Sequence, residues 1–250
     1  MIPKIIHYCW FSGDPFPEDI EKCIESWRKH FPDYEIIQWN TSNFDVNMSR
    51  YTSEAFSKRK WAFLSDYARL WILYNYGGIY LDSDIEVFKS FDPLLSNHAF
   101  TGFESNDRIA AWIFGSEKGN SVIGELLDYY KDRSFILPNG DLDLTPNPVP
   151  LTQILIKHGM TRNNEYQILC DGNFTIYPMT YFCPKRPYEK TECFTENTYA
   201  MHLFSGAWLT SNQKKRRERA SWRLVHMIAK MVLFIFGEKK YAEIKKHIKL

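Results

Sequence analysis

The stretch KWAFLSDYARLWILYNYGGIYLDSDIEVF, residues 60–88, decides the fold that the sequence predicts. Apolar side chains recur every three or four positions from Trp61 to Trp71, which is the spacing of an amphipathic helix with one buried face. Gly77 and Gly78 follow the last apolar turn, and a glycine at that point commonly ends a helix. We therefore predict a helix that stops at the two glycines and is followed directly by a strand.

An Asp-x-Asp pair interrupts that strand. Residues 79–81 are apolar, Asp82 and Asp84 follow, and residues 85–88 resume the apolar pattern. In an extended chain these two carboxylates point to the same side, about 6.6 Å apart along the backbone, and so placed they bind a hard cation such as Mg²⁺ or Mn²⁺. Fourteen aspartates in 250 residues give about 0.8 such pairs by chance, so an ordinary turn with capping carboxylates is the alternative.

The N-terminal part predicts the order strand, helix, strand. Residues 4–10 are an apolar run, residues 17–31 have a helical apolar face with acids in the first turn, and residues 34–39 form a second apolar run. A unit of this kind predicts two parallel strands in an α/β nucleotide-binding-type sheet. Further along the chain, the patterns predict strands at 100–103, 109–114, 167–169, 174–177 and 199–203, helices at 121–130 and 151–158, and a loop at 134–150.

Charge is distributed unevenly between the two ends of the chain. The 250 residues carry a net charge of +1, but residues 213–250 contain 12 Lys and Arg against 3 Glu. We predict one domain at residues 1–212 and a basic amphipathic helical tail at residues 213–250. The tail is too short and interrupted to span a bilayer, which needs about 20 apolar residues. It either lies in a membrane interface or packs on the protein's own core.

The cysteines and the first residues predict a cytoplasmic protein. The five cysteines show no zinc spacing and read as free thiols, with Cys9 and Cys23 as small buried side chains. Met1 to Lys4 lead into a strand without a signal-peptide pattern. Together with the basic tail, this predicts a peripheral location at the inner face of the cell membrane. No motif predicts nucleic-acid binding.

Three blocks of sequence resemble one enzyme family. The run FLSDYARLWILYNYGGIYLDSDIEVF (63–88), the start IPKIIHYCWF (2–11) and the late HLFSGAW (202–208) are similar to family 32 glycosyltransferases, which include bacterial capsular-polysaccharide enzymes and Och1-like mannosyltransferases. The resemblance implies a GT-A-like α/β domain with a DxD motif. It also implies a retaining reaction that needs no enzyme nucleophile.

The resemblance implies a metal site and a closing aromatic residue. Asp84 is then the direct ligand, Asp82 contacts the donor and the water shell of the metal, and His202 completes the site. Trp208 closes over the donor, and Ser205 takes the place of the serine that relatives carry next to this tryptophan. The alternative for His202, one histidine among seven, is a hydrogen-bonded residue of the core.

A donor pocket is implied by four further residues. Asp66 and Arg69 are neighbours on one helix face and resemble an Ser-Asp-x-x-Arg element that binds sugar hydroxyls and a phosphate oxygen. The alternative is a helix-surface ion pair of little energetic value. Tyr80 would lie near the ribose or diphosphate. Trp10 ends the first strand and either stacks on the nucleobase or belongs to the core.

The sequence thus predicts a metal-dependent transferase that uses Mn²⁺ or Mg²⁺ and a UDP-sugar, with galactose or glucose favoured. The expected acceptor is a lipid-linked oligosaccharide or a polysaccharide of the bacterial surface, and Glu104, at a predicted strand end, is a candidate to align its hydroxyl. The alternatives are a GDP-mannose-dependent mannosyltransferase, a non-enzymatic nucleotide-sugar-binding module and a phosphohydrolase. A phosphohydrolase would need a further His/Asp cluster for a second metal.

Overall fold

The computed structural model describes residues 1–185 and 193–206. The chain separates into two compact units, Met1–Ser205 and Gly206–Leu250. Trp208, the predicted boundary after residue 212 and the predicted tail at 213–250 lie outside the described residues. Within the described part, no helix has both the length and the hydrophobicity that a membrane span requires.

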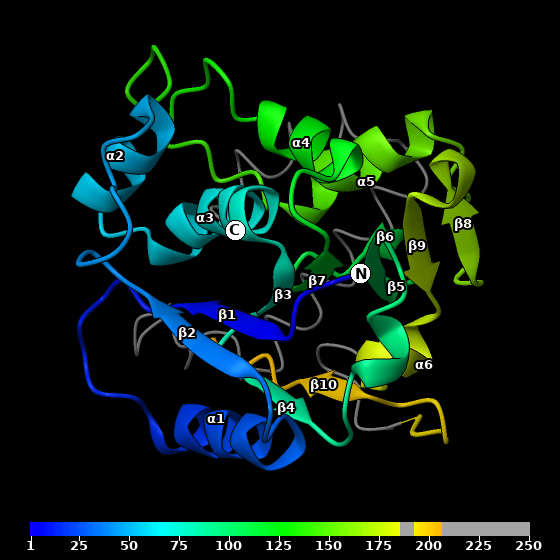
Figure 1. Ribbon diagram of the computed structural model, residues 1–250. Helices are drawn as coiled ribbons and strands as arrows, with labels where there is room; N and C mark the ends of the chain where they lie inside the picture. Colours follow the sequence, from blue (N-terminus) through cyan, green and yellow to red (C-terminus); the bar gives the residue numbers. More distant parts are fainter. Residues whose placement is uncertain (186–192, 207–250) are drawn as a thin grey trace, which may run out of the picture. The chain divides into compact units, whose positions relative to one another are not determined.

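A mixed sheet of eight strands forms the centre of the first unit (Figure 1). Seven strands follow one another in the order β2-β1-β3-β7-β5-β9-β8, and β6 pairs with β5 beside this row. A separate antiparallel pair consists of β4 and β10. The strands are β1 (Ile5–Cys9), β2 (Glu35–Trp39), β3 (Gly78–Leu81), β4 (Ile85–Val87), β5 (Ala99–Ser105), β6 (Arg108–Ile109), β7 (Ile113–Ser116), β8 (Gln167–Leu169), β9 (Phe174–Tyr177) and β10 (Ala200–His202).

Five strands of the main sheet point in the same direction. β1 is parallel to β2 and β3, and β5 is parallel to β9. Because β7 is antiparallel to both β3 and β5, β5 has the direction of β3. The carboxyl ends of β1, β3 and β5 therefore lie at one edge, which is where open α/β sheets bind their ligands. The predicted α/β fold class, with a parallel β1-α1-β2 start, is confirmed.

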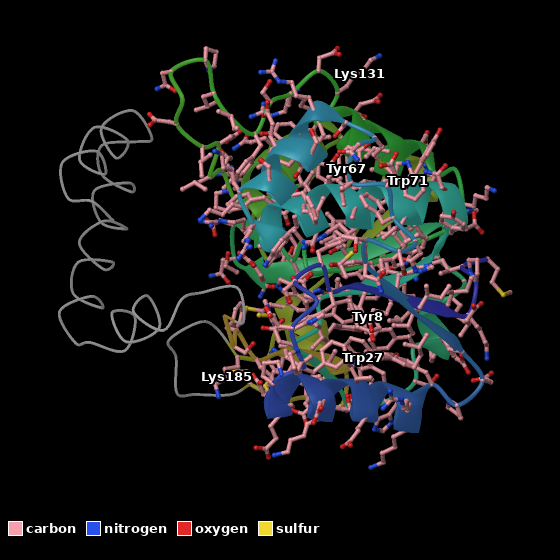
Figure 2. All side chains as sticks on the ribbon, turned by 90° about the vertical axis from the view of Figure 1, so that its left-hand side faces the viewer. Tyr8, Trp27, Tyr67, Trp71, Lys131 and Lys185 are labelled. Carbon is pink, nitrogen blue, oxygen red and sulfur yellow. The ribbon has the colours of Figure 1, made fainter. Side chains whose placement is uncertain are left out.

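Helices cover both faces of the sheet. In Figure 1, α3, α4 and α5 lie on one side of the main sheet, and α1 lies on the other side with β4 and β10. Figure 2 shows Tyr8 of β1 and Trp27 of α1 close together, and their ring centroids are 5.3 Å apart. The helices are α1 (Glu18–His30), α2 (Arg50–Ser57), α3 (Trp61–Tyr76), α4 (Ser121–Asp128), α5 (Pro148–Lys157) and α6 (Met179–Phe182), with single 3₁₀ turns η1 (Asp92–Leu94) and η2 (Cys170–Gly172).

The junction between α3 and β3 explains the two glycines. Gly77 and Gly78 have φ angles of 70° and 94°, a region that favours glycine. A Cβ on Gly78 would also meet the His7 Nε2 atom at 2.8 Å. His7 is fully buried, contacts the Gly77 carbonyl through Nε2 at 2.9 Å, and accepts a hydrogen bond from Trp39 Nε1 at Nδ1. This histidine therefore fixes the end of α3, from which β3 leads to the Asp-x-Asp pair.

The pair β4-β10 brings a distant segment beside that point. His202 is paired with Ile85, and Leu203 N donates to the Asp84 carbonyl at 3.0 Å. Trp27 of α1 donates from its indole nitrogen to the Ile85 carbonyl at 2.7 Å. As a result, α1 and β10 both hold the start of β4, immediately after the two aspartates.

Two predicted boundaries were wrong, and one helix was not predicted. Residues 109–114 are not one strand, because β6 ends at Ile109 and β7 begins only at Ile113; the turn between them serves the site described below. Helix α2 was not predicted, although Ser49 and Thr52 form a capping box at its start. Helix α5 begins inside the predicted loop 134–150, with Pro148 in its first turn, where proline is tolerated.

Candidate active site

The two aspartates lie on a tight turn at the carboxyl end of β3, and the extended arrangement predicted for them was wrong. Ile85 N donates to the Asp82 carbonyl at 3.2 Å and closes this turn, so β4 leaves the main sheet. Asp82 N donates to the Trp112 carbonyl at 2.9 Å. Because the backbone reverses here, the two carboxylates reach different parts of the protein.

Asp82 binds groups from α3 and β3. Its Oδ1 atom accepts hydrogen bonds from Arg69 Nη2 at 3.0 Å and from the Tyr80 hydroxyl at 2.9 Å. Arg69 Nη2 also lies 3.1 Å from Asp66 Oδ1, and its Nη1 donates to the Ala111 carbonyl. The guanidinium carbon lies 5.0 Å from the centre of the Tyr80 ring. These contacts join one cation to two carboxylates.

This charged cluster is buried. The Arg69 side chain is 5% exposed and that of Asp66 is 13% exposed, so the alternative of a solvent-exposed ion pair on a helix surface is wrong. Burial raises the pKa of Asp66 to about 7, although Arg69 opposes the shift. Burial also raises the pKa of Asp82, against the effect of Arg69. Ionising Asp66 and Asp82 at the same time is therefore costly, and both carboxylates contact Arg69.

Asp84 binds groups from the end of the described chain. Its Oδ1 atom lies 3.1 Å from His202 Nε2, and its Oδ2 atom accepts from Ser205 N at 3.0 Å and Ser205 Oγ at 3.1 Å. Burial favours the neutral acid, but His202 and Ser205 outweigh burial and hold the pKa of Asp84 at about 2. Burial lowers the pKa of His202, and Asp84 more than offsets that effect, so the net shift is upward.

Asp82, Asp84 and His202 fit a divalent cation. Each offers a ligand atom, and these atoms lie within 4.8 Å of one another. His202 Nδ1 is buried and has no hydrogen-bond partner among the described residues, so a lone pair or proton at this nitrogen is unsatisfied. Two carboxylates suit Mg²⁺ or Mn²⁺, and the imidazole favours the softer Mn²⁺ of the two. The predicted ligands are brought together.

Trp10 lies at the carboxyl end of β1 and lines an open cavity of about 660 Å³. Its indole nitrogen donates to the Asp14 carbonyl at 2.7 Å, and its ring packs edge-on against Phe16 at 5.0 Å. Because β1 and β3 are parallel neighbours, this cavity and Asp82 lie at the same edge of the sheet. The further lining residues are Phe11, Ser12, Gly13, Asp14, Gln38, Asn40, Thr41, Phe56, Ser57, Arg59 and Trp61.

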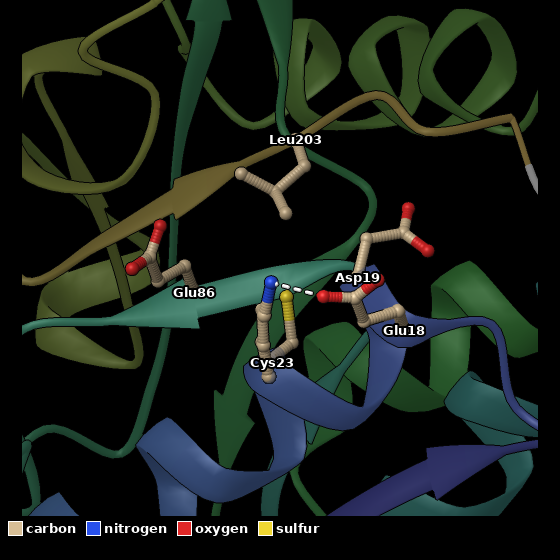
Figure 3. A pocket seen from close by; sticks show the side chains of 6 residues that line it. Glu18, Asp19, Cys23, Glu86 and Leu203 are labelled. Carbon is tan, nitrogen blue, oxygen red and sulfur yellow. Dashed lines mark hydrogen bonds and ion pairs between the residues drawn. The ribbon is translucent and has the colours of Figure 1, made fainter.

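A second hollow of about 420 Å³ lies between α1 and the β4-β10 pair (Figure 3). Its carboxylates come from Glu18, Asp19 and Glu86, and Lys22 pairs with Glu18 at 2.6 Å. The thiol of Cys23 lines it and belongs to a buried residue, as predicted. These side chains form no metal-sized cluster within the described residues, where Asp82, Asp84 and His202 form the one such group.

The sequence did not predict two residues beside the cluster. Trp112 precedes β7, and its ring centroid lies 4.8 Å from that of His202. Asn147 stands at the N-cap position of α5, where its side chain makes no capping hydrogen bond. It is buried and donates from Nδ2 to the Asp66 carbonyl at 3.2 Å. Neither residue belongs to a periodic pattern.

The chain is similar to known glycosyltransferases in this region. Residues 17–101 match the model of a family described as the glycosyltransferase sugar-binding region containing the DXD motif. The match includes Asp66, Arg69, Tyr80 and the two aspartates of the turn. It confirms the predicted DXD sugar-binding region, and a role in capsule synthesis stays a prediction.

Curated relatives come from fungi and from a virus. The chain is 32% identical over 130 residues to inositol phosphoceramide mannosyltransferase 3 of Schizosaccharomyces pombe, covering 49% of this chain and 35% of the relative. It is 25% identical to a mannosyl phosphorylinositol ceramide synthase of Saccharomyces cerevisiae, covering 73% and 50%. An uncharacterized glycosyltransferase of Acanthamoeba polyphaga mimivirus is 27% identical, covering 81% and 86%. The chain spans about a third of the fission-yeast relative.

Solved structures give more distant matches. A glycosyltransferase called PaToxG aligns with 18% identity and a TM-score of 0.46, over 62% of this chain and 68% of that chain. A glycosyltransferase that acts in the glycosylation of the major capsid of PBCV-1 aligns with 11% identity and a TM-score of 0.41, over 70% and 82%.

Proposed function

We propose that this protein is a metal-dependent glycosyltransferase that takes its sugar from a nucleotide-sugar donor. The observation that carries the proposal is the group of Asp82, Asp84 and His202 at the carboxyl edge of the sheet, next to the buried cluster of Arg69 and Asp66. Asp82, Asp84 and His202 would hold a divalent cation, which would supply positive charge against the negative charge that develops on the departing diphosphate.

Different residues around the cation site bind different parts of the donor. Arg69 donates to a phosphate oxygen of the donor, and a guanidinium is well suited to that role. Asp66, whose carboxyl lies beside Arg69, accepts hydrogen bonds from hydroxyls of the transferred sugar. Trp10 stacks on the nucleobase in the cavity at the end of β1. Tyr80 and Ser205 hold the two carboxylates of the turn in place.

The identity of the sugar is the finer part of the proposal. Relatives whose names state an activity are mannosyltransferases, and this favours GDP-mannose as the donor over the UDP-galactose or UDP-glucose predicted from the sequence. Their names also state an inositol phosphoceramide acceptor, so a polyol or sugar hydroxyl on a lipid or polysaccharide is the acceptor class that we propose. A cytoplasmic site of action at a membrane surface belongs to the same proposal.

The two alternative functions, a phosphohydrolase and a non-enzymatic binding module, make different predictions from a transferase. A two-metal phosphohydrolase requires a second ligand cluster, and the described residues contain one cluster of three possible ligands. A non-enzymatic module requires donor binding alone, without turnover. The experiment below separates both from the transferase.

The test is nucleotide release from a donor panel. GDP-mannose, UDP-galactose, UDP-glucose and UDP-N-acetylglucosamine are incubated with the full chain and Mn²⁺, with and without EDTA. We expect slow release from one donor, abolished by EDTA and by Asp84→Asn. Binding of a nucleotide without release from any donor would support the binding module, and release of phosphate from simple phosphomonoesters would support the hydrolase.

A further inference from the structure

One buried oxygen atom beside the proposed donor pocket has no hydrogen-bond partner. It belongs to Asn147 at the start of α5, and what we infer from it rests on the proposed function. Asn147 is 1% exposed, and its Oδ1 atom is unpaired among residues 1–185 and 193–206. A buried acceptor without a partner costs folding free energy, so buried amide oxygens are nearly always paired. A hydroxyl group of a ligand would supply the missing donor.

The sequence at the start of α5 explains why this oxygen is unpaired. An asparagine at an N-cap position usually accepts from the second or third backbone N–H group of its helix. In α5 the third residue is Pro150, which has no N–H group, and Val149 N donates to the Pro146 carbonyl at 3.0 Å. The Asn147 side chain therefore makes no capping bond and contacts α3, which lies on the same side of the main sheet (Figure 1).

Asn120, at the same position of α4, shows the usual arrangement. Its Oδ1 atom accepts from Val122 N at 3.0 Å and from Ile123 N at 3.2 Å. Asn120 is also buried. Of these two asparagines, Asn120 caps its helix and Asn147 does not. Helix capping thus explains Asn120 and leaves Asn147 unexplained.

The contact with Asp66 determines how the Asn147 amide group is oriented. Asn147 Nδ2 donates to the Asp66 backbone carbonyl at 3.2 Å. A carbonyl can only accept, so the amide nitrogen faces it and Oδ1 lies on the other side of the same amide group. Burial raises the pKa of the Asp66 carboxyl, and Arg69 and the Asn147 side chain oppose that shift, so the amide also lies beside the carboxyl. Asp66 Oδ1 in turn lies 3.1 Å from Arg69 Nη2.

We propose that Asn147 Oδ1 accepts a hydrogen bond from a hydroxyl of the transferred sugar, next to the hydroxyl that Asp66 binds. Asn147 and Asp66 together then select a hexose with two neighbouring hydroxyls. A sugar that lacks the hydroxyl leaves the amide oxygen buried and unpaired, and a site built in this way rejects such a sugar strongly. Asn147 is therefore a residue that determines which sugar the enzyme accepts.

The first test separates the sugar from the nucleotide. Calorimetry in Mn²⁺ compares GDP-mannose with GDP, and UDP-glucose with UDP, for the wild type, Asn147→Leu and Asn147→Ala. Leucine keeps the branched shape of asparagine without its polar atoms. We expect both variants to raise the Kd of the sugar nucleotide by about 10-fold, the size of one hydrogen bond, and to leave the Kd of the nucleotide unchanged. The matched control is Asn120→Ala, which should lower the thermal midpoint and leave both Kd values unchanged.

The second test separates direct contact from an indirect effect through Asp66. It uses single-deoxy derivatives of GDP-mannose and UDP-glucose, one for each hydroxyl of the sugar. In the wild type, the loss of either of two neighbouring hydroxyls should weaken binding by about 10-fold. Asn147→Leu should remove the penalty for one of these hydroxyls, and Asp66→Ala should remove the penalty for the other.

Two outcomes would overturn this inference and leave the proposed function intact. One is a sugar-nucleotide Kd that is unchanged in both Asn147→Leu and Asn147→Ala. The other is that Asn147→Leu and Asp66→Ala remove the penalty for the same hydroxyl, because Asn147 would then only position Asp66. A wild-type chain that binds none of the four nucleotides in Mn²⁺ would overturn the proposed function itself. A thermal midpoint of Asn147→Ala close to that of the wild type confirms that the variant is folded.

Discussion

Asp82 and Asp84 are two residues apart, yet they belong to two different regions of the molecule. Asp82 is held by Arg69 and Tyr80, which come from the helix and strand immediately before it. Asp84 is held by His202 and Ser205, which lie 118 and 121 residues away in sequence. The tight turn between β3 and β4 orients the two carboxylates differently, so that each contacts a different region.

The two regions also shift carboxyl pKa values in opposite directions. On the Asp82 side, two buried carboxylates share one arginine, and the pKa of Asp66 rises to about 7. On the Asp84 side, an imidazole and a serine stabilise one carboxylate, and its pKa falls to about 2. We infer that Asp84, with His202 and Ser205, mainly binds the cation. Asp82, with Asp66, Arg69 and Tyr80, mainly forms hydrogen bonds with a polar ligand.

The largest effect is expected from Asp84→Asn. This variant removes the carboxylate that remains ionised and should abolish measurable Mn²⁺ binding. Nucleotide release should fall by about 10³-fold, because a metal contributes several kcal/mol of charge stabilisation. Calorimetry with Mn²⁺ and the release assay measure both. The control is Glu86→Gln, two residues further along β4 and outside the group of three ligands. Mn²⁺ affinity that is retained in Asp84→Asn would place the cation elsewhere.

The next effect concerns Arg69, the cation that contacts both Asp66 and Asp82 in the described part of the chain. Arg69→Met leaves Asp66 and Asp82 without a buried positive charge, and breaking a buried ion pair in this way costs about 3–5 kcal/mol. Urea unfolding at pH 7 measures the loss. Arg69→Lys keeps the charge but loses the forked geometry, so it should recover part of the stability and little of the donor affinity. A loss below about 1 kcal/mol would mean that the cluster is held by other contacts.

The same comparison shows which parts of the site could be predicted from sequence. Asp66, Arg69, Tyr80 and Asp82 lie on one continuous helix–glycine–strand segment, and helical and strand periodicity place them together. No periodicity joins Asp84 to His202, because the β4-β10 pairing connects them across more than a hundred residues. Only the resemblance to a family suggested that contact.

Other parts of the site depend on packing that no local pattern records. Trp112 and Asn147 lie directly before β7 and α5, and their contacts with the site depend on how these elements pack. Residue Ser83 lies in a turn, where an extended chain was expected. In the fold, β1, α1, β2, α3 and β3 were predicted correctly because each has a clear period, whereas α2 between them was missed. Further along the chain, the strands predicted at 167–169 and 174–177 agree with β8 and β9, whereas the strand predicted at 109–114 is interrupted by a turn between β6 and β7.

A pH dependence of stability should separate the two regions. The folded-state pKa of Asp66, about 7, is above its ordinary value of 3.8, so its stabilising effect is complete at low pH and is lost as the pH rises from about 4 through 7. The loss amounts to at most about 4 kcal/mol. Asp84 has the opposite sign, because its pKa is lowered and its contribution is lost only as the pH falls toward 2. We therefore expect Asp66→Asn to gain stability relative to the wild type between pH 5 and pH 8.

Thermal midpoints in EDTA, measured at pH 5, 6, 7 and 8, check this expectation. Asp143→Asn is a suitable control, because the pKa of that carboxyl is lowered and the carboxyl pairs with Arg133 at 2.5 Å. The difference between this control and the wild type should be constant across the same range. A constant difference for Asp66→Asn as well would mean that Asp66 is ionised throughout, and the charge contrast between the two regions would disappear.

The smallest expected effects come from removing one hydroxyl on each side. Ser205→Ala loses the 3.1 Å hydrogen bond from Oγ to Asp84 but keeps the one from the backbone nitrogen, and Tyr80→Phe loses the 2.9 Å bond to Asp82. Each deletion should cost about 0.5–1.5 kcal/mol. The readouts should differ: Ser205→Ala weakens Mn²⁺ binding by about 10-fold, as expected for a group that orients a ligand, whereas Tyr80→Phe weakens nucleotide binding at saturating Mn²⁺. If both variants weakened Mn²⁺ binding equally, the positions of the two carboxylates would be coupled through the turn. The loss of either hydroxyl would then affect both carboxylates.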